Sequence, residues 1–138
     1  MTILVAYDGS APAQKAVKRA FDEYADEEIV LLRVVDVADG YTEASIKAVH
    51  ELLTDRRETA AEKLRADLPE IVDTADVDFR TETATGDPAR EIVTFAEEHD
   101  VDHIIVGSHG REGVSRVLLG SVAERVVRRA PVSVTVVR

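Results

Sequence analysis

The feature that most constrains the fold is a regular alternation between short apolar runs and longer segments with helical periodicity. Apolar runs of strand length occupy residues 3–7, 29–35, 103–106 and 132–137. Between them, apolar residues recur at the spacing that places them on one face of a helix, over residues 10–24, 43–68, 88–99 and 121–129. Strands that alternate with helices indicate βαβ units and therefore a parallel sheet.

Local signals predict where several elements begin and end. Ser10 can cap the first helix with Pro12 in its first turn, and Gly86-Asp87-Pro88 forms a turn followed by a capped helix start. Pro69 is expected to end the long second helix. A further strand is expected over residues 76–83, where apolar and polar residues alternate as they do in an edge strand with one solvated face.

Five strands with right-handed crossovers predict an α/β fold. We expect one doubly wound, Rossmann-like domain over residues 1–138, with a five-stranded parallel sheet of order 3-2-1-4-5 and helices on both faces. The order reverses between strands 1 and 4, and ligands of such sheets bind outside the carboxyl ends of the strands at that point. Asp8 follows the first strand and Gly107 ends the fourth, so both are expected at the ligand crevice.

The most informative motif is Gly107-Ser-His-Gly110, followed after nine residues by Gly120-Ser121. Glycines let the backbone approach a ligand closely, and the free N–H groups of Gly120, Ser121 and Val122 at a helix start form an anion site. The loop contains no lysine, so it is not a P-loop, and no G-x-G-x-x-G follows the first strand. The motif alone leaves two interpretations open: a phosphate site at a helix N-terminus, or glycines that only form turns.

The spacing G-x2-G-x9-G-[ST] after an apolar strand resembles the ATP-binding branch of the universal stress protein family. The similarity also covers ILVAYDGS at the start, RVVDV at the end of the second strand, and the closing GSVAERVVRRAPVSVTVVR. It therefore extends over the whole chain. The position of Ala6 is often a proline in relatives, and this departure matters little because the implied contact comes from backbone and a small apolar surface.

The resemblance implies that ATP is the ligand and that a divalent metal, Mg²⁺ or Mn²⁺, is held through its phosphates. It implies that Asp8 hydrogen-bonds the ribose and that Val34 contacts the adenine largely through its backbone. By the same resemblance, the nucleotide-binding residues are those that frame the adenine (Ala6, Val34), line the ribose (Asp8, Val106, Gly107) and hold the phosphates (Gly110, Gly120, Ser121, Val122).

Three functions from different classes compete. The first is a regulatory protein that couples ATP occupancy to a stress response through an unidentified protein partner. The second is a slow ATPase with the same pocket, although the sequence offers no obvious general base, cationic finger or carboxylate metal cluster, so we expect no catalytic residues. The third is a phosphoacceptor receiver domain, which needs a lysine late in the chain, whereas the last lysine here is Lys63.

The charge balance excludes some partners. A net charge of -10 argues against nucleic-acid binding, which needs a basic face. Only four of the 17 basic residues are lysine, a composition that resembles proteins of halophilic microbes, although an ordinary acidic cytosolic protein is the alternative. The sequence has no cysteine, no signal-peptide pattern and no apolar run near the roughly 20 residues that span a bilayer. We therefore expect a cytoplasmic protein without membrane contact.

Other polar residues give weaker signals. His109 could touch a phosphate or serve as an acid, but a lone loop histidine more often faces solvent. Asp8, Ser108 and His109 are residue types of a catalytic triad, yet the adjacency of the last two gives poor geometry. Arg111 and Arg116 could cover the phosphates or pair with acidic neighbours.

The last strand predicts an oligomeric state. Residues 132–137 form an apolar run that the expected order places at the sheet edge, where unpaired backbone groups favour pairing with another chain. We therefore expect a homodimer joined through the C-terminal strand about a two-fold axis. The family resemblance implies the same arrangement.

Overall fold

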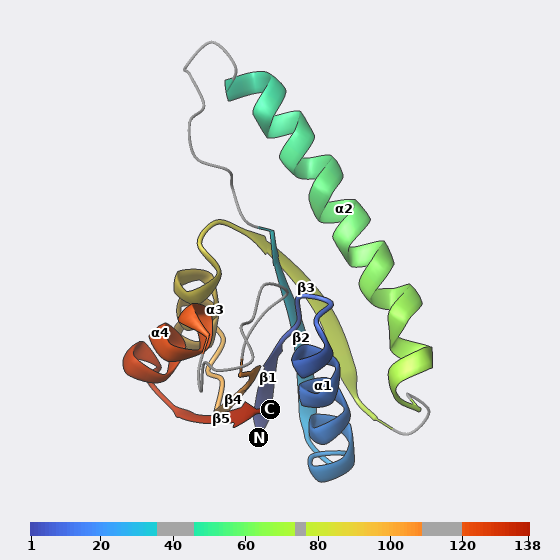
Figure 1. Ribbon diagram of the computed structural model, residues 1–138, viewed down its shortest axis with the longest axis vertical. Coiled ribbons are helices and arrows are strands. Elements are labelled where there is room, and N and C mark those ends of the chain that lie inside the picture. The colour runs from blue at the N-terminus through green and yellow to red at the C-terminus, as the bar shows by residue number, and fades with distance from the viewer. Residues whose placement is uncertain (36–45, 74–76, 109–119) are drawn as a thin grey trace.

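One parallel sheet of five strands, in the order β3-β2-β1-β4-β5, organises the molecule (Figure 1). The computed structural model describes residues 1–35, 46–73, 77–108 and 120–138, and for residues 46–57 it describes the backbone alone. The elements in chain order are β1 (Thr2–Ala6), α1 (Ala11–Glu23), β2 (Glu28–Val35), α2 (Ile46–Ile71), β3 (Phe79–Thr85), α3 (Pro88–Glu98), β4 (His103–Gly107), α4 (Ser121–Arg129) and β5 (Ser133–Val137). The predicted fold class and strand order are confirmed.

Two apolar cores lie on opposite faces of the sheet because successive strand side chains point to opposite sides. Ile3 and Val5 of β1 join the core under α1 and α2, whereas Leu4 joins the core under α3 and α4. The central strands are buried on both faces, which explains why their sequences are continuously apolar. Figure 1 shows the two helix pairs on either side of the sheet.

The predicted helix starts at α1 and α3 are confirmed. The Ser10 side chain caps α1 by accepting a hydrogen bond from the Ala13 N–H at 3.2 Å. The Asp87 side chain caps α3 in the same way, with the Arg90 N–H as donor at 3.1 Å. Each cap satisfies one of the N–H groups that a helix leaves without an internal partner.

Two predicted boundaries are wrong. Pro69 does not end α2, which continues to Ile71, and the Val72 N–H still donates to the Leu68 carbonyl at 3.0 Å. A proline in the last turn removes one hydrogen bond of the ladder without breaking the next one. The third strand spans Phe79–Thr85 and ends two residues later than the predicted 76–83, because its pairing with β2 extends as far as Val35 and Thr85; residue 76 of the predicted range lies outside the described residues. Its edge position is confirmed.

Candidate functional site

The carboxyl ends of β1, β2 and β4 meet at one edge of the sheet and bring together three of the predicted apolar site residues. Ala6, Val34 and Val106 all pack on the face covered by α3 and α4. Val106 is buried and the other two are partly exposed, so they form an apolar floor at the point where the strand order reverses. An apolar floor of this kind suits the flat face of an aromatic ring.

A tight turn holds Asp8 at the same edge. The Asp8 Oδ1 atom accepts a hydrogen bond from the Ser10 N–H at 2.9 Å. Gly9 between them has φ of 84°, in the left-handed region that glycine adopts without strain. Because Ser10 also caps α1, the Asp8 carboxylate is fixed between the end of β1 and the start of α1.

Gly107 lies against the first turn of α1. A Cβ atom at this position would lie 2.8 Å from the Pro12 Cβ, 2.9 Å from the Pro12 carbonyl carbon and 3.0 Å from the Ala13 nitrogen. Any side chain would therefore push β4 and α1 apart. The requirement for glycine here is one of packing, since its φ is not in the left-handed region.

Ser108 fastens the N-terminus of α4 to the end of β4. Its N–H donates to the Val137 carbonyl at 2.7 Å, and its carbonyl accepts from the Gly120 N–H. Gly120 is the N-cap residue of α4 and has no side chain to cap the helix. The expectation that the Gly120 N–H is free is wrong, because Ser108 already uses it. Within the ranges that the structure describes, no acceptor is recorded for the Ser121 and Val122 N–H groups.

Part of the predicted site falls outside the described residues. Gly110, His109, Arg111 and Arg116 all lie in the segment 109–119. The remaining phosphate-site residues are placed at the start of α4, where Ser121 is exposed and Val122 is half-buried. The end of β1, which Asp8 follows, thus lies next to the end of β4 at the strand-order reversal, where Ser108 also holds the first turn of α4.

Comparison with known families matches residues 1–138 to the model of the universal stress protein family. The chain belongs to this family. Universal stress protein MJ0531 of Methanocaldococcus jannaschii is 36% identical over 141 residues, which cover 99% of this chain and 81% of that protein. The structure of UspA from Lactobacillus plantarum has a TM-score of 0.86 at 30% identity and covers 100% of this chain and 97% of that one.

A second solved structure is informative about ligands in the family. It is a universal stress protein in complex with cAMP, with a TM-score of 0.62 and 26% identity, and the match covers 100% of this chain and 96% of that chain. A protein of similar sequence and fold thus binds an adenine nucleotide.

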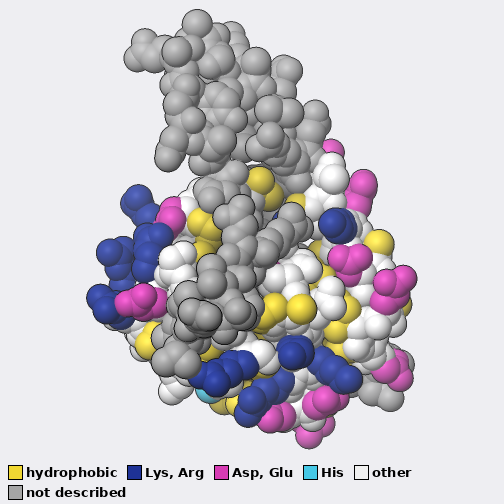
Figure 2. Space-filling view, viewed as in Figure 1, with side chains coloured by type: hydrophobic (Ala, Val, Ile, Leu, Met, Phe, Trp, Pro, Cys, Tyr) yellow, Lys and Arg dark blue, Asp and Glu magenta, His cyan; other side chains and the backbone are white. Residues whose placement is uncertain are grey.

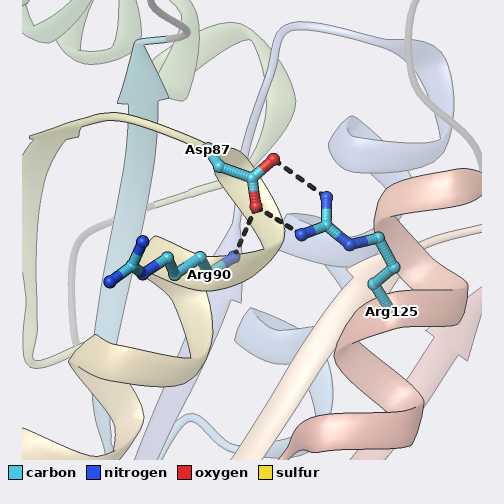
Figure 3. A network of polar contacts seen from close by, with 3 residues as sticks. All are labelled: Asp87, Arg90 and Arg125. Atoms are coloured by element: carbon cyan, nitrogen blue, oxygen red, sulfur yellow. Dashed lines mark hydrogen bonds and ion pairs between the residues drawn. The ribbon is translucent and has the colours of Figure 1, made fainter.

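In this universal stress protein, a bidentate ion pair joins Asp87, the N-cap residue of α3, to Arg125 of α4. Arg125 of α4 donates from Nη1 to Asp87 Oδ1 at 2.9 Å and from Nη2 to Asp87 Oδ2 at 2.7 Å (Figure 3). The hydrogen bond from Arg125 is the main reason that the pKa of Asp87 is lowered, and the Arg90 N–H acts in the same direction. Sequence reasoning predicted the Asp87 cap but missed Arg125, which is 38 residues away and has no local signal.

A second polar contact between distant parts of the chain involves Tyr7, the residue before Asp8. The Tyr7 hydroxyl donates to Asp67 Oδ2 of α2 at 3.3 Å, and the Tyr7 side chain is buried. Burial, followed by the nearby Asp67 carboxylate, raises the pKa of Tyr7 to about 12. This hydrogen bond joins α2 to Tyr7, the neighbour of Asp8. The sequence analysis did not predict it.

The described part of this universal stress protein offers neither a metal site built from protein side chains nor a membrane-spanning helix. Among the side chains of residues 1–35, 58–73, 77–108 and 120–138, no group of three or more His, Asp or Glu could hold a metal ion. In the same ranges, no helix is both long and apolar enough to cross a membrane. Ser108, one of the three residue types considered for a catalytic triad, is buried, and its backbone is hydrogen-bonded to Val137 and Gly120.

Proposed function

We propose that this universal stress protein binds ATP at the carboxyl edge of its sheet, as one nucleotide-binding domain over residues 1–138, and regulates a stress response according to nucleotide occupancy. The observation that carries the proposal is the hydrogen bond from the Gly120 N–H to the Ser108 carbonyl. It holds the N-terminus of α4 at the end of β4, beside Asp8 and the apolar floor. The cAMP complex of a relative supports an adenine nucleotide as the ligand.

In this proposal each part of the nucleotide meets a matching surface. The adenine packs on the apolar floor, and the ribose hydroxyls donate to the Asp8 carboxylate. The phosphates accept hydrogen bonds from the N–H groups of Ser121 and Val122, where the helix dipole favours negative charge. Gly120 contributes its lack of a side chain, and Gly110 is assigned to the phosphates by the family motif. The proposed contacts are Ala6, Asp8, Val34, Val106, Gly107, Gly110, Gly120, Ser121 and Val122.

The proposal assigns the divalent metal to the nucleotide. Mg²⁺ binds through substrate phosphates and retained waters in many nucleotide sites, so a protein carboxylate cluster is not required. We therefore expect that EDTA weakens ATP binding but does not affect adenosine binding. Equal loss of both ligands on addition of EDTA would contradict this assignment of the metal.

Calorimetry on wild type and glycine variants tests the site. Gly110→Val and Gly120→Val each place a branched side chain where the phosphates are expected, so ATP binding should become undetectable while the circular dichroism spectrum is retained. Ala25→Val is the matched control, because Ala25 is exposed in the turn before β2, at the opposite edge of the sheet. Unchanged affinity in both glycine variants would eliminate the site.

Mass spectrometry of the natively purified protein identifies the nucleotide that it retains, and a phosphate-release assay separates the two nucleotide functions. A regulator is expected to hold ATP without measurable turnover. Turnover well above that of the Gly120→Val variant would instead favour the slow ATPase.

We also propose that the protein forms a homodimer through β5. This strand is the sheet edge next to β4, and its Val134 and Val136 are only partly buried by their own chain. Pairing with a second copy would satisfy the outer backbone groups and cover the valines. Light scattering should report a dimer for wild type and a monomer for Val136→Lys, with circular dichroism to verify folding. A wild type that is monomeric at micromolar concentration would refute the dimer.

A further inference from the structure

The ion pair between Asp87 and Arg125 joins the N-cap residue of α3 to a residue of α4. Asp87 uses both carboxylate oxygens on Arg125, and Oδ2 also accepts from the Arg90 N–H at 3.1 Å (Figure 3). The two side chains are 41% and 42% exposed, and pairs this exposed contribute little to stability. The bidentate geometry across 38 residues therefore suggests a role other than holding the fold together.

Helix geometry places this pair next to the proposed phosphate site. Arg125 follows Ser121 by four residues, so the two lie on one face of α4, about 6 Å apart along its axis. Helical side chains lean toward the N-terminus, so the Arg125 guanidinium covers the turn that begins at Ser121. The Asp87 carboxylate, held by that guanidinium, is consequently a fixed negative charge beside the phosphate site.

The charges around the first turn of α4 show a consistent pattern. The turn contains a second carboxylate, Glu124, and Arg128 pairs with it at 2.8 Å. Two carboxylates, Asp87 and Glu124, are thus each paired with an arginine of α4. Figure 2 shows lysine and arginine side chains gathered on the side of the molecule where α3 and α4 lie, although the chain as a whole carries a net charge of -10.

We propose that Arg125 is a positioning residue for nucleotide phosphates, because it cancels the charge of Asp87 and keeps that carboxylate turned toward itself. The inference rests on the proposed ATP site. It adds that Arg125 determines how strongly this site binds the phosphates of the nucleotide. Asp87 caps α3 through the Arg90 N–H and is held against α4 by Arg125. Its charge would repel a triphosphate if Arg125 were absent. The adenine and ribose contacts do not depend on this pair.

The test compares ATP with adenosine, which shares the base and ribose but carries no phosphate. An uncompensated unit charge within about 12 Å of a phosphate, at the effective dielectric constant of about 20 found near a protein surface, changes an affinity about tenfold or more. Arg125→Gln should therefore weaken ATP binding about tenfold and leave adenosine binding unchanged. Arg128→Gln is the matched control on the same helix. It removes the ion-pair partner of Glu124, and because that pair is more exposed, it should weaken ATP binding less than Arg125→Gln does.

Two further variants separate charge cancellation from a simple structural clamp. Asp87→Asn keeps an oxygen that can cap α3 but removes the charge, so it should restore ATP affinity when combined with Arg125→Gln. Arg125→Lys keeps the positive charge without the planar fork and should retain most of the wild-type affinity. A clamp predicts the opposite, because both the double variant and the lysine variant would bind ATP as poorly as Arg125→Gln.

The outcomes distinguish this inference from the function on which it rests. If wild type binds ATP but Arg125→Gln weakens ATP and adenosine binding equally, or weakens neither, the inference about Arg125 is wrong while the proposed ATP site is retained. If wild type binds neither ligand, both are wrong. Thermal unfolding of each variant identifies any that fail to fold. If Arg125→Gln is one of them, the double variant decides, because retained ATP affinity supports charge cancellation and lost affinity supports a clamp.

Discussion

Replacement of Tyr7 by phenylalanine should reverse the order of stability of the two proteins as the pH is raised. At neutral pH the wild type keeps the hydrogen bond from the Tyr7 hydroxyl to Asp67, whereas Tyr7→Phe loses it. A hydrogen bond of this kind contributes about 1 kcal/mol to the free energy of unfolding. The variant should therefore be less stable by about that amount below pH 9.

The reversal follows from the pKa of Tyr7, which is raised to about 12 in the folded protein, from about 10 in an unfolded chain. A raised pKa means that the folded state holds the proton more tightly, so this stabilisation is fully present below about pH 10 and is lost as the pH rises toward 12. The wild type should lose about 1.4 kcal/mol by pH 11 and about 2.7 kcal/mol in full. Phenylalanine does not titrate, so the two stabilities should cross near pH 11.

Urea unfolding followed by circular dichroism, at pH 7 to 11.5, measures both curves. The difference between wild type and Tyr7→Phe cancels the titration of lysines, which is common to both proteins. Absorbance at 295 nm gives the tyrosine titration independently. A difference in unfolding free energy that stays constant over the whole range would show that the Tyr7 hydroxyl is not buried against Asp67, and the reasoning would fail.

Three other perturbations test the packing and the surface charge. Gly107→Ala places a methyl group 2.8 Å from the Pro12 Cβ. We therefore expect the free energy of unfolding, measured by calorimetry, to fall by about 1–3 kcal/mol and ATP binding to weaken. An unchanged melting temperature would contradict the close approach. Ile105→Ala, at a position with 0% exposure, should cost roughly 3 kcal/mol, whereas Val127→Ala, 45% exposed, should stay within about 0.5 kcal/mol. A net charge of -10 predicts a melting temperature that rises with salt, and a flat salt series would remove the proposed halophilic adaptation.

The parts of the fold that local patterns encode could be predicted from the sequence. Continuous apolar runs predicted the doubly covered strands, and the reversal of strand order placed Asp8 and Gly107 at the same edge. The prediction that Pro69 ends α2 was wrong because it treated any proline as a helix end. It did not consider whether the backbone N–H groups after the proline can still donate to carbonyls one turn earlier. In the last turn, one missing hydrogen bond is tolerated while the Val72 N–H continues the ladder.

The contacts that complete the candidate site could not be predicted, because they join residues far apart in the chain. The Tyr7 hydroxyl meets Asp67 across 60 residues, and Asp87 meets Arg125 across 38. Neither pair has a spacing or periodicity that indicates it. The hydrogen bond from the Gly120 N–H to the Ser108 carbonyl also depends on where β4 and α4 lie relative to each other, and so a motif alone could not show it.

The central position of β1 has a consequence for the synthesis of the chain. On one side β1 pairs with β2 soon after both are made, but on the other side it pairs with β4, and the Thr2 N–H bonds the Asp102 carboxylate across 100 residues. At a translation rate of 5–20 residues per second, the ribosome needs about 5–20 s to add that stretch. Throughout this interval the most apolar strand of the nascent chain has an unpaired edge, which chaperones and aggregation-prone neighbours can both reach. Slowing translation between β2 and β4 should therefore lengthen this exposure and lower the yield of native protein.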